Sequence, residues 1–473
     1  MFKNSIKTNL INYYMNIKQI LNNEQYINKE LIVNGWITTE RKQKNILFIS
    51  LNDGSCFNNL QIVIDMNDDI KNKYNDLIAK ITRGVSLQIF GKIIKSPNKG
   101  QLVEMSANID NVVLLGEVDV NTYPLSKMKH PPEFIRQFPH LRVRTNLGGV
   151  VARIRNTCSK ATHDFFQNRG FLYVHTPLMT ANDCEGAGET FQIIPTNTKK
   201  FDEFFGTNVN LTVSGQLHGE SYAVGLTNIY TFGPTFRAEK SNTSRHLAEF
   251  WMIEPEMCFI NFEDLMDISE KHLQYCIKSV LENNKDDIDF INKHVSKGRY
   301  DMLVNMCENK FKRISYSEAI NVLMQDYNTN CGYSKVEEWG IDLNSEHEKY
   351  LVKKYGPLIA YNYPKKIKSF YMKTNEDYEN NQQTVQSMDM LVPDIGEIIG
   401  GSMRETNLSK LETIMTEKGV SKELDWYLDL RRYGSVEHGG YGLGFERLIM
   451  LITGVNNIKD TIPYPRYYGK CSF

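Results

Sequence analysis

Residues 232–250 hold the side chains in this chain that are best suited to chemistry on a phosphorylated ligand. Arg237 can grip a phosphate with two parallel N–H donors, and Glu239 can accept from a neighbouring amine. Phe250 offers a flat apolar face to a base, while Arg245 and His246 add cationic donors between them. The segment is typical of a strand, a loop and a second strand. These residue types in this order are suited to holding a nucleotide.

A second cluster of this kind occupies residues 442–448. Gly442 and Gly444 let the backbone approach a ligand closely, and Arg447 stands at a predicted helix start. Alone, an arginine and a glutamate two positions apart, as in the first cluster, more often form a structural ion pair. The joint occurrence of both clusters favours the nucleotide site. Together they resemble motifs 2 and 3 of the class II aminoacyl-tRNA synthetases.

Short apolar runs between residues 30 and 115 indicate a separate β-rich unit that precedes these motifs. Turn signals at residues 52–55 and 96–100 separate the runs. Five short strands in fewer than about a hundred residues predict a small closed barrel of the OB type. A segment rich in proline and basic residues follows, at 123–144, and is predicted to connect two domains.

The clearest predicted helix begins near residue 151 and ends at Gly170. Its apolar stripe repeats at spacings of three and four, and comprises Val151, Ile154, Cys158, Ala161 and Phe165. An alternating segment from 172 to Pro177 follows. Helix, strand and proline in this order resemble motif 1, the dimer-forming motif of the same enzyme class. The alternative is a core helix whose stripe packs inward.

Composition limits the other classes of protein. The 473 residues carry a formal net charge of -1, so binding of RNA would depend on local basic patches. The longest apolar runs are far shorter than the roughly 20 residues that a membrane-spanning helix needs. The eight cysteines form no C-x-x-C pair and predict reduced thiols. Neither a dinucleotide-binding G-x-G-x-x-G nor a P-loop is present, so arginine side chains would have to hold ATP.

From about residue 17 to residue 473 the chain resembles the asparaginyl-tRNA synthetases. The strings that carry the resemblance are residues 185–191, 211–220, 339–343, 397–405 and 429–434. The resemblance implies an α+β fold, in which an N-terminal OB-type barrel precedes a catalytic domain built on an antiparallel sheet flanked by helices. It divides the chain into an extension and anticodon-binding domain (1–116), a linker (117–145) and the catalytic domain (146–473).

Residues 219 and 220 distinguish this family from the sister aspartyl enzymes. Those enzymes typically have a lysine at the position of Gly219, which neutralises the substrate carboxylate. Here an acid, Glu220, follows the glycine. Asparagine needs one donor and one acceptor, which Arg404 and Glu220 can supply. Aspartate would face Glu220 with one cation fewer, so one acid opposite one guanidinium predicts selection of the carboxamide.

The resemblance also assigns the ATP contacts. Arg237 should hold the α-phosphate and the asparagine carboxylate, and Phe250 and Arg447 should cover the two faces of adenine. Arg245 and His246 are expected at the β- and γ-phosphates, and Glu239 should accept from the adenine amine or from the tRNA terminus. The expected catalytic set is Arg237, Glu239 and Arg447.

Magnesium is expected to accompany ATP, held by Asp389 and Glu397 with phosphate oxygens and water. Asp394 is an alternative to Asp389. Glu185 and Gln216 are the expected partners of the substrate α-amino and carboxylate groups.

In the barrel, Phe48 and Gln61 match the positions at which relatives stack and read the middle anticodon uridine, and Arg41 belongs to a basic loop beside them. An inward-facing core position is the alternative for Phe48. Lys240 and His218 depart from the common family pattern.

The expected partners are L-asparagine, ATP, tRNA(Asn) and a second copy of the chain, bound through the helix at 150–169. We expect no membrane association and a cytoplasmic location, with a mitochondrial targeting segment at residues 1–23 as the alternative. An aspartyl enzyme that charges one or both tRNAs is the main alternative function. The others are an inert paralogue that serves as a nucleic-acid-binding or regulatory module, and a relative that forms asparagine by amidation.

Overall fold

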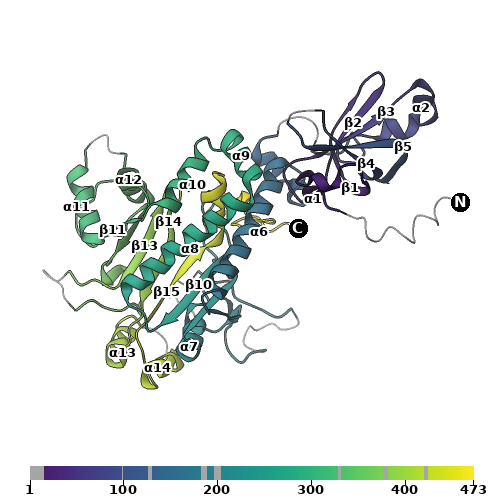
Figure 1. Ribbon diagram of the computed structural model, residues 1–473. Coiled ribbons are helices and arrows are strands. Elements are labelled where there is room, and N and C mark those ends of the chain that lie inside the picture. The colour runs from purple at the N-terminus through teal and green to yellow at the C-terminus, as the bar shows by residue number, and fades with distance from the viewer. Residues whose placement is uncertain are drawn as a thin grey trace. The chain divides into compact units, whose positions relative to one another are not determined.

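The computed structural model describes residues 15–97, 100–125, 130–182, 189–196, 204–328, 332–376, 382–419 and 424–473. The chain forms two compact units, Met1–Arg153 and Ile154–Phe473, which divide within one long helix. Figure 1 shows the elements of each unit.

The first unit is a closed five-stranded barrel, as the apolar runs predicted. Its strands follow the order β1-β2-β3-β5-β4 around the barrel. The strands are β1 (Glu30–Lys42), β2 (Ile46–Asn52), β3 (Leu60–Asp65), β4 (Ser86–Lys95) and β5 (Val103–Gly116). Alternate residues such as Ile49, Ile62 and Ile89 are fully buried and fill the barrel. The helical segments of this unit are α1 (Ile17–Leu21), η1 (Glu24–Tyr26), α2 (Asp68–Lys73), α3 (Asn75–Lys80), α4 (Pro132–Ile135) and α5 (Pro139–Arg142).

Helix α6 (Asn146–Gln167) contains the division between the units, and its predicted stripe is buried. Ile154, Cys158 and Phe165 are each 0% exposed. The inward-packing interpretation of the stripe is therefore the one that the structure shows. Burial raises the pKa of the Cys158 thiol well above its usual value, and the six cysteines of the described residues are all free.

The second unit contains an eight-stranded sheet in its described residues, with strand order β11-β12-β13-β14-β15-β10-β9-β6. The strands are β6 (Leu172–Tyr173), β9 (Asn228–Phe236), β10 (Glu249–Cys258), β11 (Lys312–Ser315), β12 (Leu358–Tyr361), β13 (Ser387–Val392), β14 (Gly396–Met403) and β15 (His438–Gly444). The central strands pair antiparallel as predicted, but the edge strands β11 and β6 pair parallel with their neighbours. The sheet is therefore mixed. Strands β7 (Met179–Thr180) and β8 (Asn210–Leu211) pair separately.

Helices flank this sheet, and α8 runs along one face of it over β14 and β15 (Figure 1). Its buried side chains Leu265, Leu273 and Ile277 form the stripe that faces the core. The helical elements of the unit beyond α6 are α7 (Gln216–Leu226), α8 (Phe262–Asn283), α9 (Lys285–His294), α10 (Arg299–Glu308), α11 (Tyr316–Asp326), α12 (Ser345–Tyr355), α13 (Leu408–Glu417), α14 (Asp425–Arg432), α15 (Phe445–Thr453), η2 (Lys365–Ile367) and η4 (Ile458–Asp460). None of the helices in the described part of the chain has the length and apolar character needed to cross a bilayer.

Candidate active site

The β9–β10 pair brings Arg237 and Phe250 to the same face of the sheet. Phe250 pairs with Thr235, and the Arg237 backbone N–H donates to the carbonyl of Ala248 at 3.0 Å. Because side chains two positions apart on a strand share a face, Arg237 lies beside Thr235 and Phe250. The Arg237 guanidinium carbon is 5.5 Å from the centre of the Phe250 ring. A base stacked on Phe250 would thus have a cation at its edge.

The loop between these strands holds His246 near Glu239. The Nδ1 atom of His246 lies 2.6 Å from the Thr243 hydroxyl and 3.0 Å from the Ser241 hydroxyl. Its Nε2 atom lies 3.6 Å from a Glu239 carboxylate oxygen. The imidazole is therefore fixed by two hydroxyls on one side, and its other nitrogen is directed toward an acid.

The last part of the chain braces this loop. Ile458 donates its backbone N–H to the Ser244 carbonyl at 2.9 Å, and Lys459 Nζ donates to the Asn242 side chain at 2.8 Å. At the base of the loop, Ala248 donates to the carbonyl of Arg466 at 2.7 Å. The loop that carries His246 is thus attached to η4 and to the segment that follows it.

Helix α15 sets the position of Arg447. Glu446, in the first turn of this helix, anchors it. The Glu446 carboxylate accepts from the Trp251 N–H at 2.9 Å and pairs with Arg155 at 2.7 Å. Arg447, one residue further, donates Nη1 to the Glu397 carbonyl at 2.7 Å and lies 3.5 Å from a Glu397 carboxylate oxygen. Arg447 and Glu397 therefore form one unit across α15 and β14.

All seven residues expected at ATP line one cavity of about 690 Å³ of empty volume. They are Arg237, Glu239, Arg245, His246, Phe250, Glu397 and Arg447. Three guanidiniums and apolar surface from Met252 and Ile398 share the cavity with three acids, of which Glu446 is already paired with Arg155. This combination suits a ligand with a flat apolar part and several negative charges.

The carboxylates of Asp389 and Glu397 converge from β13 and β14. A Cβ atom on Gly400 would lie 2.9 Å from a Glu397 oxygen and 3.5 Å from an Asp389 oxygen. Lys368 holds Asp389 at 2.8 Å, and burial raises the pKa of Asp389 although Lys368 opposes the rise. No group of three or more histidine, cysteine or acidic side chains suited to a metal occurs in the described residues. Two neighbouring carboxylates are ligands of the kind that Mg²⁺ takes together with phosphate oxygens and water.

Asp394, the alternative to Asp389, is paired with a cation in the same way. Its carboxylate forms an ion pair with Arg299 at 2.8 Å, as Asp389 does with Lys368 at 2.8 Å. The ion pairs therefore do not distinguish the two acids, and both stay predicted partners of Glu397.

Glu220 is sealed inside the protein, at 0% exposure, with cationic and hydroxyl partners on several sides. Arg431 Nη2 lies 2.7 Å and His438 Nε2 2.8 Å from the same carboxylate oxygen, and the Tyr427 hydroxyl donates at 2.7 Å. Burial alone would raise the pKa of Glu220, but Arg431 and His438 lower it below its ordinary range. Glu220 is therefore ionised at neutral pH.

Arg404 pairs with a second buried acid, Glu256. Its Nε atom donates to Glu256 at 3.2 Å, a second Arg404 donor contacts the other oxygen, and Nη1 donates to the Ser402 hydroxyl at 2.7 Å. Gly440 permits this contact, because a Cβ there would lie 2.3 Å from a Glu256 oxygen. Burial raises the pKa of Glu256 to about 7, against the opposing effect of Arg404.

The prediction of one guanidinium opposite one acid is therefore wrong in its composition. The structure shows Arg404 and Arg431 with Glu220 and Glu256, and Glu220 pairs with Arg431, not with Arg404. Above the pKa of Glu256 the two carboxylates offset the two guanidiniums, and His438 belongs to the same cluster, with one ring nitrogen 2.6 Å from the Val436 carbonyl and the other 2.8 Å from Glu220.

Two family models cover most of the chain. Residues 131–468 match the family described as tRNA synthetases class II (D, K and N), and residues 31–115 match the OB-fold nucleic acid binding domain. An asparagine–tRNA ligase of Treponema denticola is 48% identical over 472 residues, covering 95% of this chain and 98% of the relative. One of Cytophaga hutchinsonii is 47% identical over 466 residues, covering 95% and 97%. The chain belongs to the asparagine–tRNA ligase family.

Solved structures of this family share the fold. The asparaginyl-tRNA synthetase of Pyrococcus horikoshii, complexed with asparaginyl-adenylate, is 29% identical with a TM-score of 0.83, covering 97% of this chain and 99% of that chain. The enzyme of Entamoeba histolytica, also complexed with asparaginyl-adenylate, is 27% identical with a TM-score of 0.79, covering 94% and 96%.

Two further side chains of this asparagine–tRNA ligase were predicted to contact the amino acid, and the structure describes one of them. Glu185 lies outside the described residues. Gln216 is buried on α7, one turn before Glu220, and its side-chain amide donates to Glu220 at 3.4 Å. The other residues of the cluster, Glu256, Tyr427, Arg431 and His438, had no predicted role. Arg431 lies in residues 429–434, one of the strings that carried the family resemblance. The resemblance therefore included Arg431 but did not indicate Glu220 as its partner.

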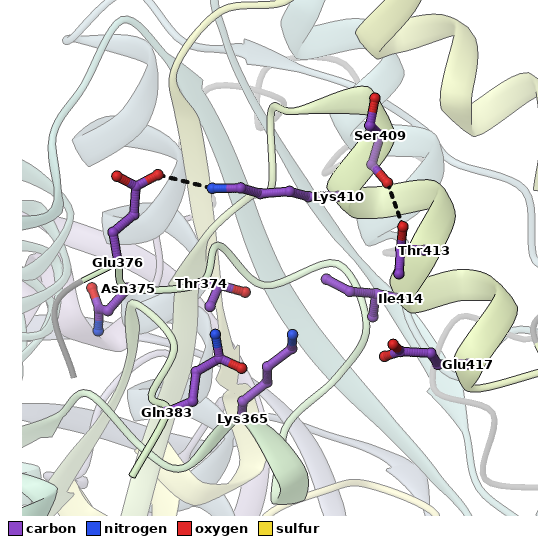
Figure 2. Close-up of a pocket in the computed structure, with 10 residues that line it drawn as sticks. All are labelled: Lys365, Thr374, Asn375, Glu376, Gln383, Ser409, Lys410, Thr413, Ile414 and Glu417. Carbon is purple, nitrogen blue, oxygen red and sulfur yellow. Dashed lines mark hydrogen bonds and ion pairs between the residues drawn. The ribbon is translucent and has the colours of Figure 1, made fainter. Parts of the chain in front are cut away.

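A second cavity of this ligase, of about 880 Å³ of empty volume, lies between α13 and the loop that holds Thr374 (Figure 2). Its lining includes two lysines and two glutamates, and Lys410 is already paired with Glu376 at 2.8 Å. The lining has no excess of positive charge to hold a triphosphate. The ATP assignment therefore stays with the cavity that contains Arg237.

On the barrel of the ligase, Phe48 faces outward, so the core alternative for this residue is wrong. Its neighbours Leu47 and Ile49 are buried, while Phe48 is partly exposed. Arg41 is its cross-strand partner and holds its guanidinium 4.6 Å from the centre of the Phe48 ring. Gln61, on β3, donates to Glu104 at 3.0 Å. Phe48 and Arg41 together offer a flat apolar and cationic surface.

Proposed function

We propose that the chain activates L-asparagine with ATP, forming asparaginyl-adenylate and pyrophosphate, and then transfers asparagine to the 3′ end of tRNA(Asn). The observation that carries this proposal is the arrangement of β10, β14 and β15. These strands connect the cavity that contains Arg237 to the buried cluster of Glu220, Glu256, Arg404 and Arg431. Phe250 and Glu256 lie six residues apart on β10, or about 20 Å at the usual rise of a strand. This span accommodates an extended aminoacyl nucleotide.

The surface between these two ends is made of glycine. Gly440, Gly442 and Gly444 occupy alternate positions of β15, the strand that pairs with both β10 and β14. The intervening Tyr441 and Leu443 are buried on the opposite face. Without side chains on its ligand face, β15 allows a substrate to lie directly along the backbone.

The first step is attack of the asparagine carboxylate on the α-phosphorus of ATP, with loss of pyrophosphate. Arg237 orients the two anions and offsets the charge that develops between them. Phe250 and Arg447 hold adenine between them, and Arg245 with His246 hold the β- and γ-phosphates. Glu239 accepts from adenine or from the tRNA end.

In the second step the terminal ribose 3′-hydroxyl of the tRNA attacks the adenylate carbonyl, and AMP leaves. The adenylate phosphate can take the ribose proton, so no side chain is required as a general base. Positioning and charge stabilisation account for both steps.

Glu397 and Asp389 are the residues that would hold Mg²⁺ in this site. When bound there with ATP, the ion would neutralise phosphate charge and fix the orientation of the triphosphate. Arg447, already in contact with Glu397, then bridges the metal ligand and the nucleotide.

The charges of this buried cluster support the choice of asparagine. Glu220 and Arg404 lie at the amino-acid end, with Gln216 beside them and Glu185 as a predicted further contact. A neutral carboxamide leaves the net charge of the cluster unchanged, whereas an aspartate would bring a further carboxylate next to Glu220 and Glu256 in a buried site. Support for the reaction as a whole comes from the asparagine–tRNA ligase relatives.

Recognition of tRNA is assigned to the barrel, where Phe48 and Arg41 would stack on an anticodon base and Gln61 would contact its edge. We also infer a homodimer formed next to α6, through residues 172–179. Because the α6 stripe is buried, exposed apolar side chains of this segment supply the contact: Leu172, Leu178 and Met179 are 50%, 42% and 54% exposed. We expect the enzyme to act in the cytoplasm, as the bacterial origin of the relatives suggests.

The test of the reaction is ATP–pyrophosphate exchange with asparagine and aspartate in parallel, followed by charging of a tRNA with a GUU anticodon. We expect exchange with asparagine only, and charging of that tRNA. Equal exchange with aspartate would refute the proposed selection, and no exchange with either amino acid would refute the proposed reaction.

A further inference from the structure

We propose that Arg299 is a positioning residue for the phosphate end of ATP, acting through Asp394. The inference rests on the proposed binding of phosphates by Arg245 and of magnesium by Glu397. Arg299 itself lies outside the ATP cavity, at the start of α10, and is 5% exposed.

Arg299 connects three separate parts of the second unit. Its Nη1 atom donates to the carbonyl of Leu451, in α15, at 3.0 Å. Its Nη2 atom donates to the Ser296 hydroxyl at 2.9 Å and to the Asp394 carboxylate at 2.8 Å. A fork of this kind fixes the orientation of its acceptors as well as their distance. Arg299 therefore ties the turn at Asp394 to the helix that carries Arg447.

The turn held by Arg299 is strained. Asp394 has a φ of 66°, in the left-handed region that residues other than glycine seldom adopt. It lies in the turn that connects β13 to β14, three residues before Glu397. A backbone in this region persists when its surroundings hold it there, and in this turn the side chain of the strained residue is the group that Arg299 grips.

The backbone of the same residue faces the ATP cavity. The Asp394 carbonyl accepts from Arg245 Nη2 at 3.2 Å. A guanidinium has five N–H donors, so one can remain on this carbonyl while the others face a phosphate. Three residues further along, Glu397 receives Arg447 on its carbonyl. One turn thus positions Arg245 directly and sets the start of the strand that holds Glu397.

The charge of Arg299 has a second effect. It neutralises the Asp394 carboxylate, whose residue also contacts Arg245. Without Arg299, that carboxylate would be free to attract the Arg245 guanidinium and would add negative charge near the bound triphosphate. Loss of Arg299 should therefore act on ATP and leave the asparagine end of the site unchanged.

The experiment measures KM for ATP and for asparagine in pyrophosphate exchange for Arg299→Met, Asp394→Asn and the double variant. We expect Arg299→Met to raise KM for ATP about tenfold, the order of one charge-assisted hydrogen bond, while KM for asparagine changes less than about twofold. The double variant should lose less than Arg299→Met alone, because it also removes the free carboxylate.

Arg313→Met is the matched control. Arg313 is also a largely covered arginine, which pairs with Glu263 and Asp267 away from the cavity. It should lower the melting temperature without changing the ratio of the two KM values. If Arg299→Met does not fold, the Asp394→Asn variant tests the inference. The left-handed backbone at residue 394 suits asparagine, and we expect this variant to raise KM for ATP alone.

Equal changes in both KM values, or a lower melting temperature with unchanged KM for ATP, would overturn the inference. Arg245→Ala separates this result from failure of the proposed function. If Arg245→Ala raises KM for ATP and the Arg299 and Asp394 variants do not, only the positioning role fails. If Arg245→Ala has no effect on KM for ATP, the proposed phosphate contact itself is refuted.

Discussion

Replacing Glu220 by glutamine should weaken discrimination against aspartate, because it removes one negative charge and leaves the guanidinium of Arg431 with an excess positive charge. The change keeps the shape of the side chain and removes the carboxylate that faces Arg431 and His438. Arg431 would retain its hydrogen bonds to the Glu405 carbonyl, at 2.8 Å, and to the Tyr427 hydroxyl, at 3.2 Å. The excess charge would then favour a ligand that brings a carboxylate.

The size of the effect follows from Coulomb's law. A charge about 5 Å from a substrate carboxylate, at an effective dielectric constant of about 20, contributes about 3 kcal/mol. This corresponds to roughly two orders of magnitude in a ratio of kcat/KM. If the native site prefers asparagine by about 10⁴-fold, the variant should prefer it by about 10²-fold. Breaking a buried ion pair should also lower the free energy of unfolding by about 3–5 kcal/mol.

The assay is pyrophosphate exchange with each amino acid at pH 8, above the pKa of about 7 that burial gives Glu256. Glu254→Gln is the matched control. Glu254 is 5% exposed and lies on β10, the strand of Glu256, but its carboxylate accepts from the Gly215 N–H at 2.9 Å and from hydroxyls. This control should lose stability and keep the ratio. A second change, Arg431→Gln, should restore the preference in Glu220→Gln by removing the guanidinium that has lost its carboxylate partner.

An unchanged asparagine-to-aspartate ratio in Glu220→Gln, with the protein folded, would refute the charge-balance reasoning. A large rise in KM for ATP would place Glu220 in the nucleotide site and contradict its assignment.

Three further predictions address other parts of the molecule. Phe48→Ala should raise KM for tRNA about tenfold by removing a stacking surface, with pyrophosphate exchange unchanged as the internal control; an unaltered KM for tRNA would exclude that surface from recognition. Burial lowers the pKa of His272 to about 3, so the folded state binds fewer protons than the unfolded state between that value and about 6.5. The free energy of unfolding should therefore fall as the pH falls through this range, by about 2 kcal/mol at pH 5. Urea unfolding of His272→Gln should show a weaker loss. An identical pH dependence in both proteins would contradict the lowered pKa of His272. Leu178→Asp should convert a dimer to a monomer in sedimentation velocity, and an unchanged sedimentation coefficient would exclude this segment from the interface.

Much of the architecture is visible in the sequence because it depends on local patterns. Alternating apolar residues predict the barrel strands, and the α6 stripe predicts a helix. The same alternation settles the orientation of Phe48, since its neighbours Leu47 and Ile49 are apolar and must face the core. The parallel pairing of the edge strands β6 and β11 has no local signal, because it depends on the path of the chain between partners.

The candidate site divides in the same way. Arg237 and Phe250 are near each other in sequence, so a hairpin pattern is enough to place them together. Glu256 and Arg404 are 148 residues apart, and Glu220 and Arg431 are brought together by α7 and α14. The sequence predicts that Arg404 and Glu220 both contact the amino acid, but only the tertiary structure shows that Arg404 pairs with Glu256 and Glu220 with Arg431.

The attachment of the His246 loop to residues 458–466 gives the order of synthesis a functional meaning. A ribosome makes Arg237 and Phe250 more than 200 residues before Ile458 and Arg466, which hold the loop in place. A nascent chain that has already formed the β9–β10 pair still lacks the backbone partners of the His246 loop. We therefore expect this loop to reach its final conformation only after residues 458–466 have been made.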